Sequence, residues 1–285
     1  MARDVKENRR LLSAFELPEC EGPKLKAFPY RNSPITWIEW MNHADGVPLR
    51  GGEGYVFKVE INSKVYALKV FKFFNPLRYK NDLEPIRGKT VTDAELGFHT
   101  DPFYAECRAY GQIETCRKRQ GLKRKYIADC YGFLALKKAD EKVLGEYGID
   151  LWCDIPPDDE FRKRAEGSPI RALVKEYIED DVQIDERAVK RMATAIKWMN
   201  RNNILIADIH PRNYKNGYIL DFGTSWTKPH CLWQSMSRSK LSVIIRIDRV
   251  RFEEMVEDLG LGPRRSLRSR PMLGSDDDDD DDNDE

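Results

Sequence analysis

The sequence lacks any long apolar run, which excludes the class of proteins that cross a membrane on hydrophobic helices. Such a helix needs roughly 18 or more consecutive apolar residues. The longest candidates, such as residues 241–247, are short and interrupted by charge. The first ten residues, MARDVKENRR, are followed by no apolar segment of the kind that a secretory signal requires. We therefore expect an intracellular protein with no membrane partner.

Clusters of cysteine or histidine with metal-ligand spacing are also lacking. The six cysteines form no C-x-x-C pair and match no zinc module, so we expect free, buried thiols. The four histidines form no metal-spaced cluster either, and His210 is expected to be structural. With 41% hydrophobic and 11% aromatic residues, the chain still has enough apolar side chains for a sizeable core. A wholly disordered protein is excluded on that ground.

The net charge of zero hides an uneven distribution of charge. Residues 276–285 contain nine acidic residues and no basic one, which leaves 48 basic against 39 acidic residues in the rest of the chain. The basic residues concentrate at 117–125 and 264–270. We expect a disordered acidic tail that contacts basic proteins, shields residues 264–270, or only aids solubility. The cluster at 117–125 is either a nuclear-localisation or nucleic-acid patch or a solvated helix end.

The first half of the chain predicts mainly strands. Residues 55–61 and 64–71 alternate apolar and polar side chains around Asn62-Ser63, a pattern typical of a β-hairpin. Residues 35–40 predict a strand or a short helix, and residues 131–136 a further strand. Asp101-Pro102 is a typical helix start, followed by apolar residues at helical spacing over 102–118. Residues 75–101 and 139–168 are polar or charged and predict an irregular insertion and a surface loop.

The second half predicts a long helix and short strands. Residues 170–178 indicate a buried strand, and residues 184–201 carry one apolar stripe at helical spacing. Short strands are expected at 204–206 and 218–220, and two helices at 241–247 and 252–261. This order of elements predicts an α+β fold. The expected organisation is a loosely ordered segment at 1–30, a domain at 31–262 with lobes at about 31–176 and 177–262, and a disordered tail at 263–285.

Two features of the predicted hairpin suggest a site for an anion. Glycine at positions 51, 52 and 54 precedes the first strand, where the backbone can approach a ligand and direct N–H groups at phosphates. A simple turn is the alternative. Lys69 alternates with Val65, Ala67 and Phe71, so it points to an apolar face and needs an anionic partner there. A lysine that extends to solvent at a sheet edge is the alternative.

Carboxylates follow in an order that suggests phosphate and metal chemistry. Glu106 lies on the predicted helix and can supply the anion that Lys69 needs. Asp208 and Asn213, five residues apart in a loop, suit a hydroxyl-orienting carboxylate and a metal-binding amide oxygen. Asp221, followed by Phe222-Gly223 at a strand end, is a typical magnesium ligand. Taken singly, Glu106 is also compatible with an ordinary solvated helix face, and Asp208 and Asn213 are also compatible with turn formation.

In this order the motifs resemble the protein-kinase-like superfamily over about residues 48–226. The resemblance implies a two-lobed kinase-like fold and catalytic roles for Asp208, Lys69 and Glu106. It also implies that Asn213 and Asp221 hold Mg2+. The residues implied to bind ATP are Gly51, Gly52, Gly54, Val56, Ala67, Lys69, Glu176 and Ile178.

More narrowly, three stretches resemble a fungal kinase-like family of kinetochore (Sim-complex) subunits. They are ECRAYGQI at Glu106, ADIHPRNYKNGYILDFG around Asp208, and SWTKPH at residues 225–230. This resemblance implies partners in a nuclear or chromatin-proximal complex, and a location in the nucleus rather than the cytoplasm.

The sequence departs from the kinase pattern at several points. Leu49 replaces the first glycine of the loop, and Ile206-Ala207 replace the His-Arg pair that usually precedes the catalytic aspartate. No A-P-E motif follows Gly223, and only about fifty residues remain before the acidic tail, which implies a shortened C-lobe. We expect Mg·ATP binding, with transfer of the γ-phosphoryl group to a protein or small-molecule hydroxyl left open. The alternative is a non-catalytic scaffold subunit of a kinetochore-type complex.

Overall fold

A computed structural model describes most of the chain. The described residues are 15–19, 21–44, 47–48, 52–86, 88–120, 126–153, 155–179 and 184–261. Several predictions concern residues outside these ranges: those on Gly51, Cys20, Leu49, the cluster at 264–270, the acidic tail and residues 121–125.

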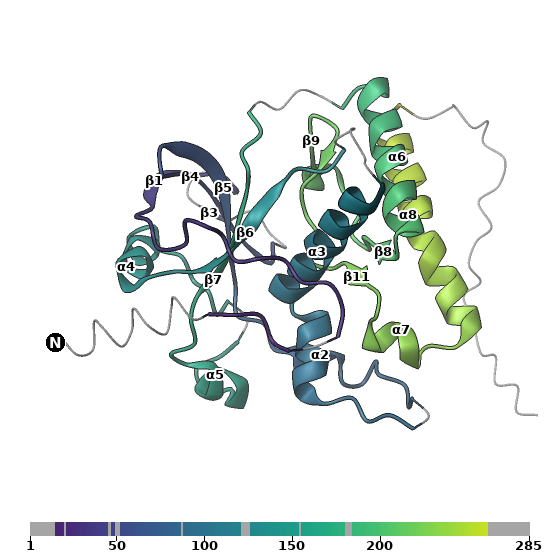
Figure 1. Cartoon of the computed structure of the whole chain (residues 1–285), viewed down its shortest axis with the longest axis horizontal. Helices are drawn as coiled ribbons and strands as arrows, with labels where there is room; N and C mark the ends of the chain where they lie inside the picture. Colours follow the sequence, from purple (N-terminus) through teal and green to yellow (C-terminus); the bar gives the residue numbers. More distant parts are fainter. Residues whose placement is uncertain are drawn as a thin grey trace, which may run out of the picture.

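The described residues form one antiparallel sheet of five strands (Figure 1). Its order is β1 (Thr36–Trp40), β4 (Gly54–Ile61), β5 (Lys64–Phe71), β7 (Arg171–Glu176) and β6 (Cys130–Ala135). The predicted hairpin is confirmed as β4–β5, and residues 36–40 form a strand rather than a helix. Asn62 and Ser63 close the hairpin with φ values of 51° and 60°, as a two-residue turn of this hand requires. A short hairpin, β2 (His43–Ala44) and β3 (Val47–Pro48), lies between β1 and β4.

The two faces of the sheet belong to two different clusters of the core. Leu68 and Val174 pack on one face with Leu144 of α4 (Lys138–Glu146). Leu173 packs on the other face, in the cluster that holds Phe103 of α3 (Pro102–Gln120). Because successive side chains of a strand point to opposite faces, the alternation seen in the sequence produces this division.

Helix α3 begins where the sequence predicts it. The side chain of Asp101 accepts a hydrogen bond from the Phe103 backbone N–H at 2.9 Å, and Pro102 is the first helical residue. Arg108, buried on this helix, donates to the backbone carbonyls of Glu21 and Thr227 at 2.9 and 2.8 Å. The helix therefore connects the N-terminal segment to β11 (Trp226–Thr227).

Two of the expected irregular regions contain helices. Residues 75–101 include η1 (Pro76–Tyr79) and α2 (Asp93–Thr100), and residues 139–168 include most of α4 and all of α5 (Glu160–Ala165). The prediction of loops was wrong because helices this short carry little apolar periodicity. Their local signals are N-caps instead: Thr92 accepts from the Glu95 N–H at 3.1 Å, and Asp159 accepts from the Phe161 N–H at 2.7 Å.

Residues 1–30 were expected to be loosely ordered, but the described part of this segment packs on the rest of the protein. Leu25 and Phe28 are buried, and the Phe28 N–H donates to the Phe133 carbonyl at 2.8 Å. Gly132 permits this approach: its φ is 137°, and a Cβ there would lie 2.6 Å from the Phe28 nitrogen. Four free cysteines are buried as predicted, whereas Cys153 is exposed.

The C-terminal part is built on two long helices, α6 (Glu186–Arg201) and α8 (Arg238–Asp258), which lie side by side (Figure 1). Met192 and Met199 of α6 share a core cluster with Phe252 and Met255 of α8. The prediction of two helices at 241–247 and 252–261 was wrong. Residues 248–251 contain neither glycine nor proline, so the helix continues through them.

Short elements connect these helices and complete the lobe. They are β8 (Ile204–Leu205), η2 (Pro211–Asn213), β9 (Tyr214–Lys215), β10 (Tyr218–Ile219), β11 and α7 (Cys231–Ser235). Within the described ranges, only β11, α7 and α8 follow the Asp221-Phe222-Gly223 turn. The structure confirms the predicted α+β class, in which an antiparallel sheet of five strands is followed by a mainly helical C-terminal part. No helix in the described part of the chain is both long and apolar enough to cross a membrane.

Candidate functional site

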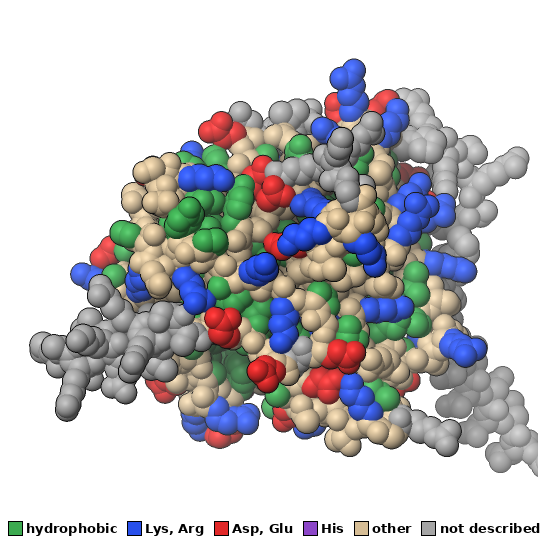
Figure 2. All heavy atoms as spheres, in the orientation of Figure 1, with side chains coloured by type: hydrophobic (Ala, Val, Ile, Leu, Met, Phe, Trp, Pro, Cys, Tyr) green, Lys and Arg blue, Asp and Glu red, His purple; other side chains and the backbone are tan. Residues whose placement is uncertain are grey.

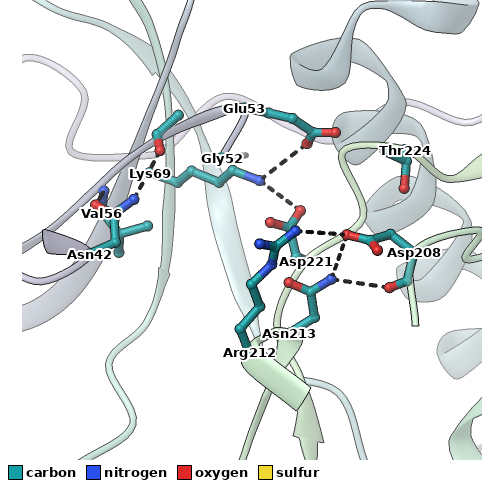
Figure 3. Close-up of a pocket in the computed structure, with 11 residues that line it drawn as sticks. Asn42, Gly52, Glu53, Val56, Lys69, Asp208, Arg212, Asn213, Asp221 and Thr224 are labelled. Atoms are coloured by element: carbon teal, nitrogen blue, oxygen red, sulfur yellow. Dashed lines mark hydrogen bonds and ion pairs between the residues drawn. The ribbon is translucent and has the colours of Figure 1, made fainter. Parts of the chain in front are cut away.

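Most of the residues singled out in the sequence meet around one cavity of about 170 Å3 (Figure 3). The start of β4 covers it on one side, and the loops before and after β9–β10 form the other. The lining residues are Asn42, Gly52, Glu53, Gly54, Val56, Lys69, Asp208, Arg212, Asn213, Asp221 and Thr224.

Lys69 forms the centre of the charged network beside this cavity. It lies on β5, the third strand of the sheet in chain order, and only 3% of its surface is exposed. Its Nζ lies 2.9 Å from Glu106 Oε2 and 2.6 Å from Asp221 Oδ1. The expected ion pair between Lys69 and Glu106 is thus present, and Asp221 is a second anionic partner.

The charges of this network are mutually stabilised. Burial alone would lower the pKa of Lys69, but Asp221, Glu106 and Glu53 raise it above its usual range. Burial alone would raise the pKa of Asp221, but Lys69 and Lys175 lower it well below the usual value for aspartate. Both groups therefore keep their charge across the physiological pH range.

Lys175 of β7 is a second lysine in the network, and it was not among the predicted site residues. Its Nζ donates to Glu106 Oε1 and to the backbone carbonyl of Leu220. Glu106 is fully buried, and each of its two carboxylate oxygens faces a different lysine. Helix α3, strand β7 and the residue before Asp221 are consequently joined through the Lys175 ammonium.

Glu53 enters the same cavity from the glycine-containing segment. Its Oε2 lies 3.8 Å from Lys69 Nζ, and a Cβ on Gly223 would lie only 1.6 Å from that oxygen. Burial, and then the charges of Asp221, Glu106 and Asp208, raise the pKa of Glu53 to about 8 despite Lys69. Glu53 was not among the predicted site residues, because a glutamate among glycines resembles an ordinary turn residue.

The loop that carries Asp208 is held by hydrogen bonds within its own turn. Asn213 Nδ2 donates to Asp208 Oδ2 at 2.9 Å and to the Asp208 carbonyl at 3.0 Å. Arg212 Nη2 lies 3.9 Å from the same carboxylate, of which 42% is exposed. His210 Nδ1 accepts from the Arg212 N–H at 3.3 Å, in keeping with its expected structural role. Asp208 therefore faces the cavity with its position constrained.

Asp248 of α8 holds the start of this loop through its backbone, and it was also not among the predicted site residues. Its carboxylate accepts hydrogen bonds from the N–H groups of Ile206 and Ala207, both at 2.8 Å. Burial raises the pKa of Asp248 to about 6, although these two N–H groups favour the ionised form. Ala207 has a φ of 67°, a conformation that L-residues seldom adopt, and Arg251 donates to its carbonyl. The carboxylate thus stabilises a strained turn next to Asp208.

The residues expected to contact adenine do not all share the cavity. Val56 lines it, whereas Ala67, Glu176 and Ile178 are not among its lining residues. The Glu176 carboxylate accepts from the Asp129 N–H at 3.1 Å. The cavity therefore corresponds to the phosphate end of the expected nucleotide site, with Gly52 and Gly54 at its edge.

The oxygen atoms of Asn213 and Asp221 suit Mg2+, but they do not form a complete metal cage. Among the described residues, no group of three or more histidine, cysteine, aspartate or glutamate side chains is arranged to hold a metal ion. Mg2+ commonly binds through one or two carboxylates together with substrate phosphates. The oxygen atoms of Asn213 and Asp221 therefore suit a metal ion that is already bound to phosphates better than a free metal ion.

Comparison with known proteins gives one family match. The family model described as "Kinetochore Sim4 complex subunit FTA2" matches residues 13–226, which include every predicted site residue. No curated protein matches the chain. Among solved structures, "Structure of vaccinia related kinase 3" is similar at 11% identity with a TM-score of 0.38. That match covers 78% of this chain and 56% of the other.

Proposed function

This chain belongs to the kinetochore Sim4 complex subunit FTA2 family, and from this premise we propose that it is a non-catalytic, kinase-like subunit of a kinetochore complex in the nucleus. The observation that carries the proposal is the family match over residues 13–226. The fold serves in this proposal as a rigid platform for other subunits.

The geometry of the cavity supports a platform rather than an enzyme. The Lys69 ammonium already has two carboxylate partners, and Glu53 occupies the space over Gly223. The phosphates of a nucleotide would have to compete with these carboxylates for the same cation. After Gly223, the described chain offers only the two-residue strand β11 and the helices α7 and α8, so it has few elements on which a peptide substrate could be seated.

A second candidate function, Mg·ATP binding, is favoured by the convergence of Lys69, Asp208, Asn213 and Asp221 on one cavity. Asn213 and Asp221 would hold Mg2+, which would neutralise charge on the phosphates. Lys69 would then bind the phosphates from the side of β5. If a hydroxyl acceptor, on a protein or a small molecule, reached the cavity, the Asp208 carboxylate is placed to accept its proton.

Co-purification with the other subunits of the complex tests the platform proposal. We expect the full chain to form a stable complex with them, and Asp208→Asn to leave that complex intact. Asp208 is partly exposed, so this variant should fold normally. Failure of the wild-type chain to join the complex would refute the proposal, and loss of assembly in Asp208→Asn would argue for a catalytic role.

Calorimetry with Mg·ATP tests the second candidate. Binding to the wild type should weaken at least tenfold in Asp221→Asn and remain unchanged in Asp258→Asn, an exposed aspartate at the end of α8. Mg2+ alone should give no heat of binding, because the protein lacks a third ligand among its described residues. No binding of Mg·ATP by the wild type would eliminate this candidate.

A further inference from the structure

The first half of α8 is aliphatic but has no buried residue. Residues 238–247 are all exposed or intermediate, although this stretch contains Leu241, Val243, Ile244, Ile245 and Ile247. Val243 is 66% exposed and Ile245 is 42% exposed. At about 100° per residue, these five side chains cover an arc of about 200° around the helix. That arc is wider than the apolar stripe of about 100° that a helix needs to pack one face on a core.

The second half of α8 shows which face of the helix the body already covers. Its buried residues are Asp248, Phe252, Met255 and Val256, all on the side that packs with α6. Helical geometry places the seam of Val243, Ile247 and Val250 about 140–180° away from Phe252. Figure 1 places α8 at an edge of the molecule.

The spacing of this seam is that of a helix-recognition surface. Val243, Ile247 and Val250 follow one another at intervals of four and three residues, the pattern by which one helix packs on another. Val250 is 49% exposed, so both ends of the seam are open to solvent. In the described part of the chain, three of the eight strongly exposed large hydrophobic residues lie on α8. Apolar surface concentrated in this way marks a site of association.

The basic charges beside the seam indicate that the partner is acidic. Residues 238–251 carry five basic side chains and a single acid, the buried Asp248. Figure 2 shows Lys and Arg side chains spread over the part of the molecule that includes α6 and α8. Arg246 lies three residues after Val243 and four before Val250, so it borders the seam directly. Within the described residues it has no ion-pair partner, and an unpaired arginine beside apolar anchors suits a carboxylate on a partner.

We propose that residues 238–251 of α8 form a docking surface for an amphipathic helix of another subunit, one with an apolar stripe flanked by Asp and Glu. The proposal rests on the proposed function, because it assumes that the chain is one subunit of a complex. It adds the surface that is used and the chemistry of the partner. Val243 and Val250 are its apolar anchors, and Arg246 selects for acidic flanks.

Two other occupants of this surface fit less well. In an antiparallel pairing of two copies, the centre of the seam would bring Arg246 close to its symmetry mate, and like charges repel. The chain's own residues 262–285 contain only Leu267, Met272 and Leu273 as large apolar side chains, next to the basic residues 264–270. The part of that segment with apolar residues is basic, like α8, so it would be repelled. The acidic part, residues 276–285, has no apolar residue to pack on the seam.

The test uses two synthetic helical peptides as probes, measured by fluorescence anisotropy against the full chain. One has leucines at intervals of four and three residues flanked by glutamates, and the other has lysine at every glutamate position. The glutamate peptide should bind at least tenfold more tightly than the lysine peptide. Val243→Ser should reduce that binding at least fivefold, and Arg246→Glu should reverse the preference. Ile38→Ser, at an exposed residue of β1, is the matched control and should bind as the wild type does.

Equal binding of the two peptides, or binding insensitive to Val243→Ser, would overturn the proposal. Self-association of the wild type that Val243→Ser abolishes would also overturn it, because the occupant would then be a second copy. Val243, Arg246 and Ile38 all face solvent, so we expect each variant to fold. Thermal unfolding of each variant checks that it does. Co-purification with the complex tests the proposed function separately. If wild-type chain joins the complex while the peptides show no preference, only the α8 inference fails.

Discussion

Replacing Glu53 with glutamine should stabilise the protein at pH 8 and have a much smaller effect at pH 5. The carboxyl of Glu53 lies beside Lys69 and against Gly223, and its pKa in the folded protein is about 8. In the unfolded chain its pKa returns to the ordinary value of 4.5. Between these two values the folded protein holds a proton that the unfolded chain has released.

The sign and the size of the effect follow from this difference. Because the folded state binds more protons in this range, the Glu53 contribution lowers the free energy of unfolding as the pH rises from 4.5 to 8. A shift of this size corresponds to at most about 5 kcal/mol, at about 1.4 kcal/mol per pH unit. The side chain is still 23% exposed, and solvent and local relaxation reduce the penalty. We expect a gain of about 1–2 kcal/mol for Glu53→Gln at pH 8.

The assay is urea unfolding of the wild type and of Glu53→Gln at pH 5, 6.5 and 8. The quantity of interest is the difference between the two proteins, because other groups titrate in both. Glu60→Gln changes an exposed glutamate on β4, the strand that follows Glu53, and should show no pH-dependent difference. A Glu53→Gln variant that is less stable than wild type at pH 8 would show that Glu53 is ionised and stabilises Lys69.

Two further predictions concern the buried charges that support the site. In a double-mutant cycle, Lys69→Met and Lys175→Met should be non-additive by about 1–3 kcal/mol, because each single variant leaves one lysine on Glu106 and the double variant leaves none. Additive unfolding energies would mean that the two lysines do not share this carboxylate. Asp248→Ala should lower the free energy of unfolding by about 2–4 kcal/mol, since two backbone N–H groups lose their acceptor. Asp258→Ala, on the exposed end of the same helix, is the control, and equal urea midpoints for the two variants would contradict this reasoning.

Much of the fold could be predicted because its signals are local. Alternation over residues 54–61 and 64–71, with Asn62-Ser63 between them, specifies a hairpin without reference to the rest of the chain. Asp101-Pro102 specifies the start of α3 in the same way. The helices α2, α4 and α5 were missed because they are short, so their stability comes from caps and from packing on the body.

The site was predictable to the extent that its residues follow a known order along the chain. Lys69 required an anion because it alternates with apolar residues, and Glu106 was the acid adjoining the apolar stripe of the next helix. The partner roles of Lys175 and Asp248 could not be read in this way. Neither residue belongs to a motif, and each acts on a group that is distant in the sequence.

The sequence by itself determined the strands of the hairpin, the helices α3 and α6, and the ordered set of charged residues that resembles a kinase. Only the tertiary structure decided how these charges are balanced. Lys175 meets Glu106 across 69 residues, Asp221 meets Lys69 across 152, and Asp248 meets Ala207 across 41. A buried charge is stable only beside its partners, and those partners are brought together by packing of the whole chain. Local pattern therefore specified which groups are present, and packing specified which of them remain available to a ligand.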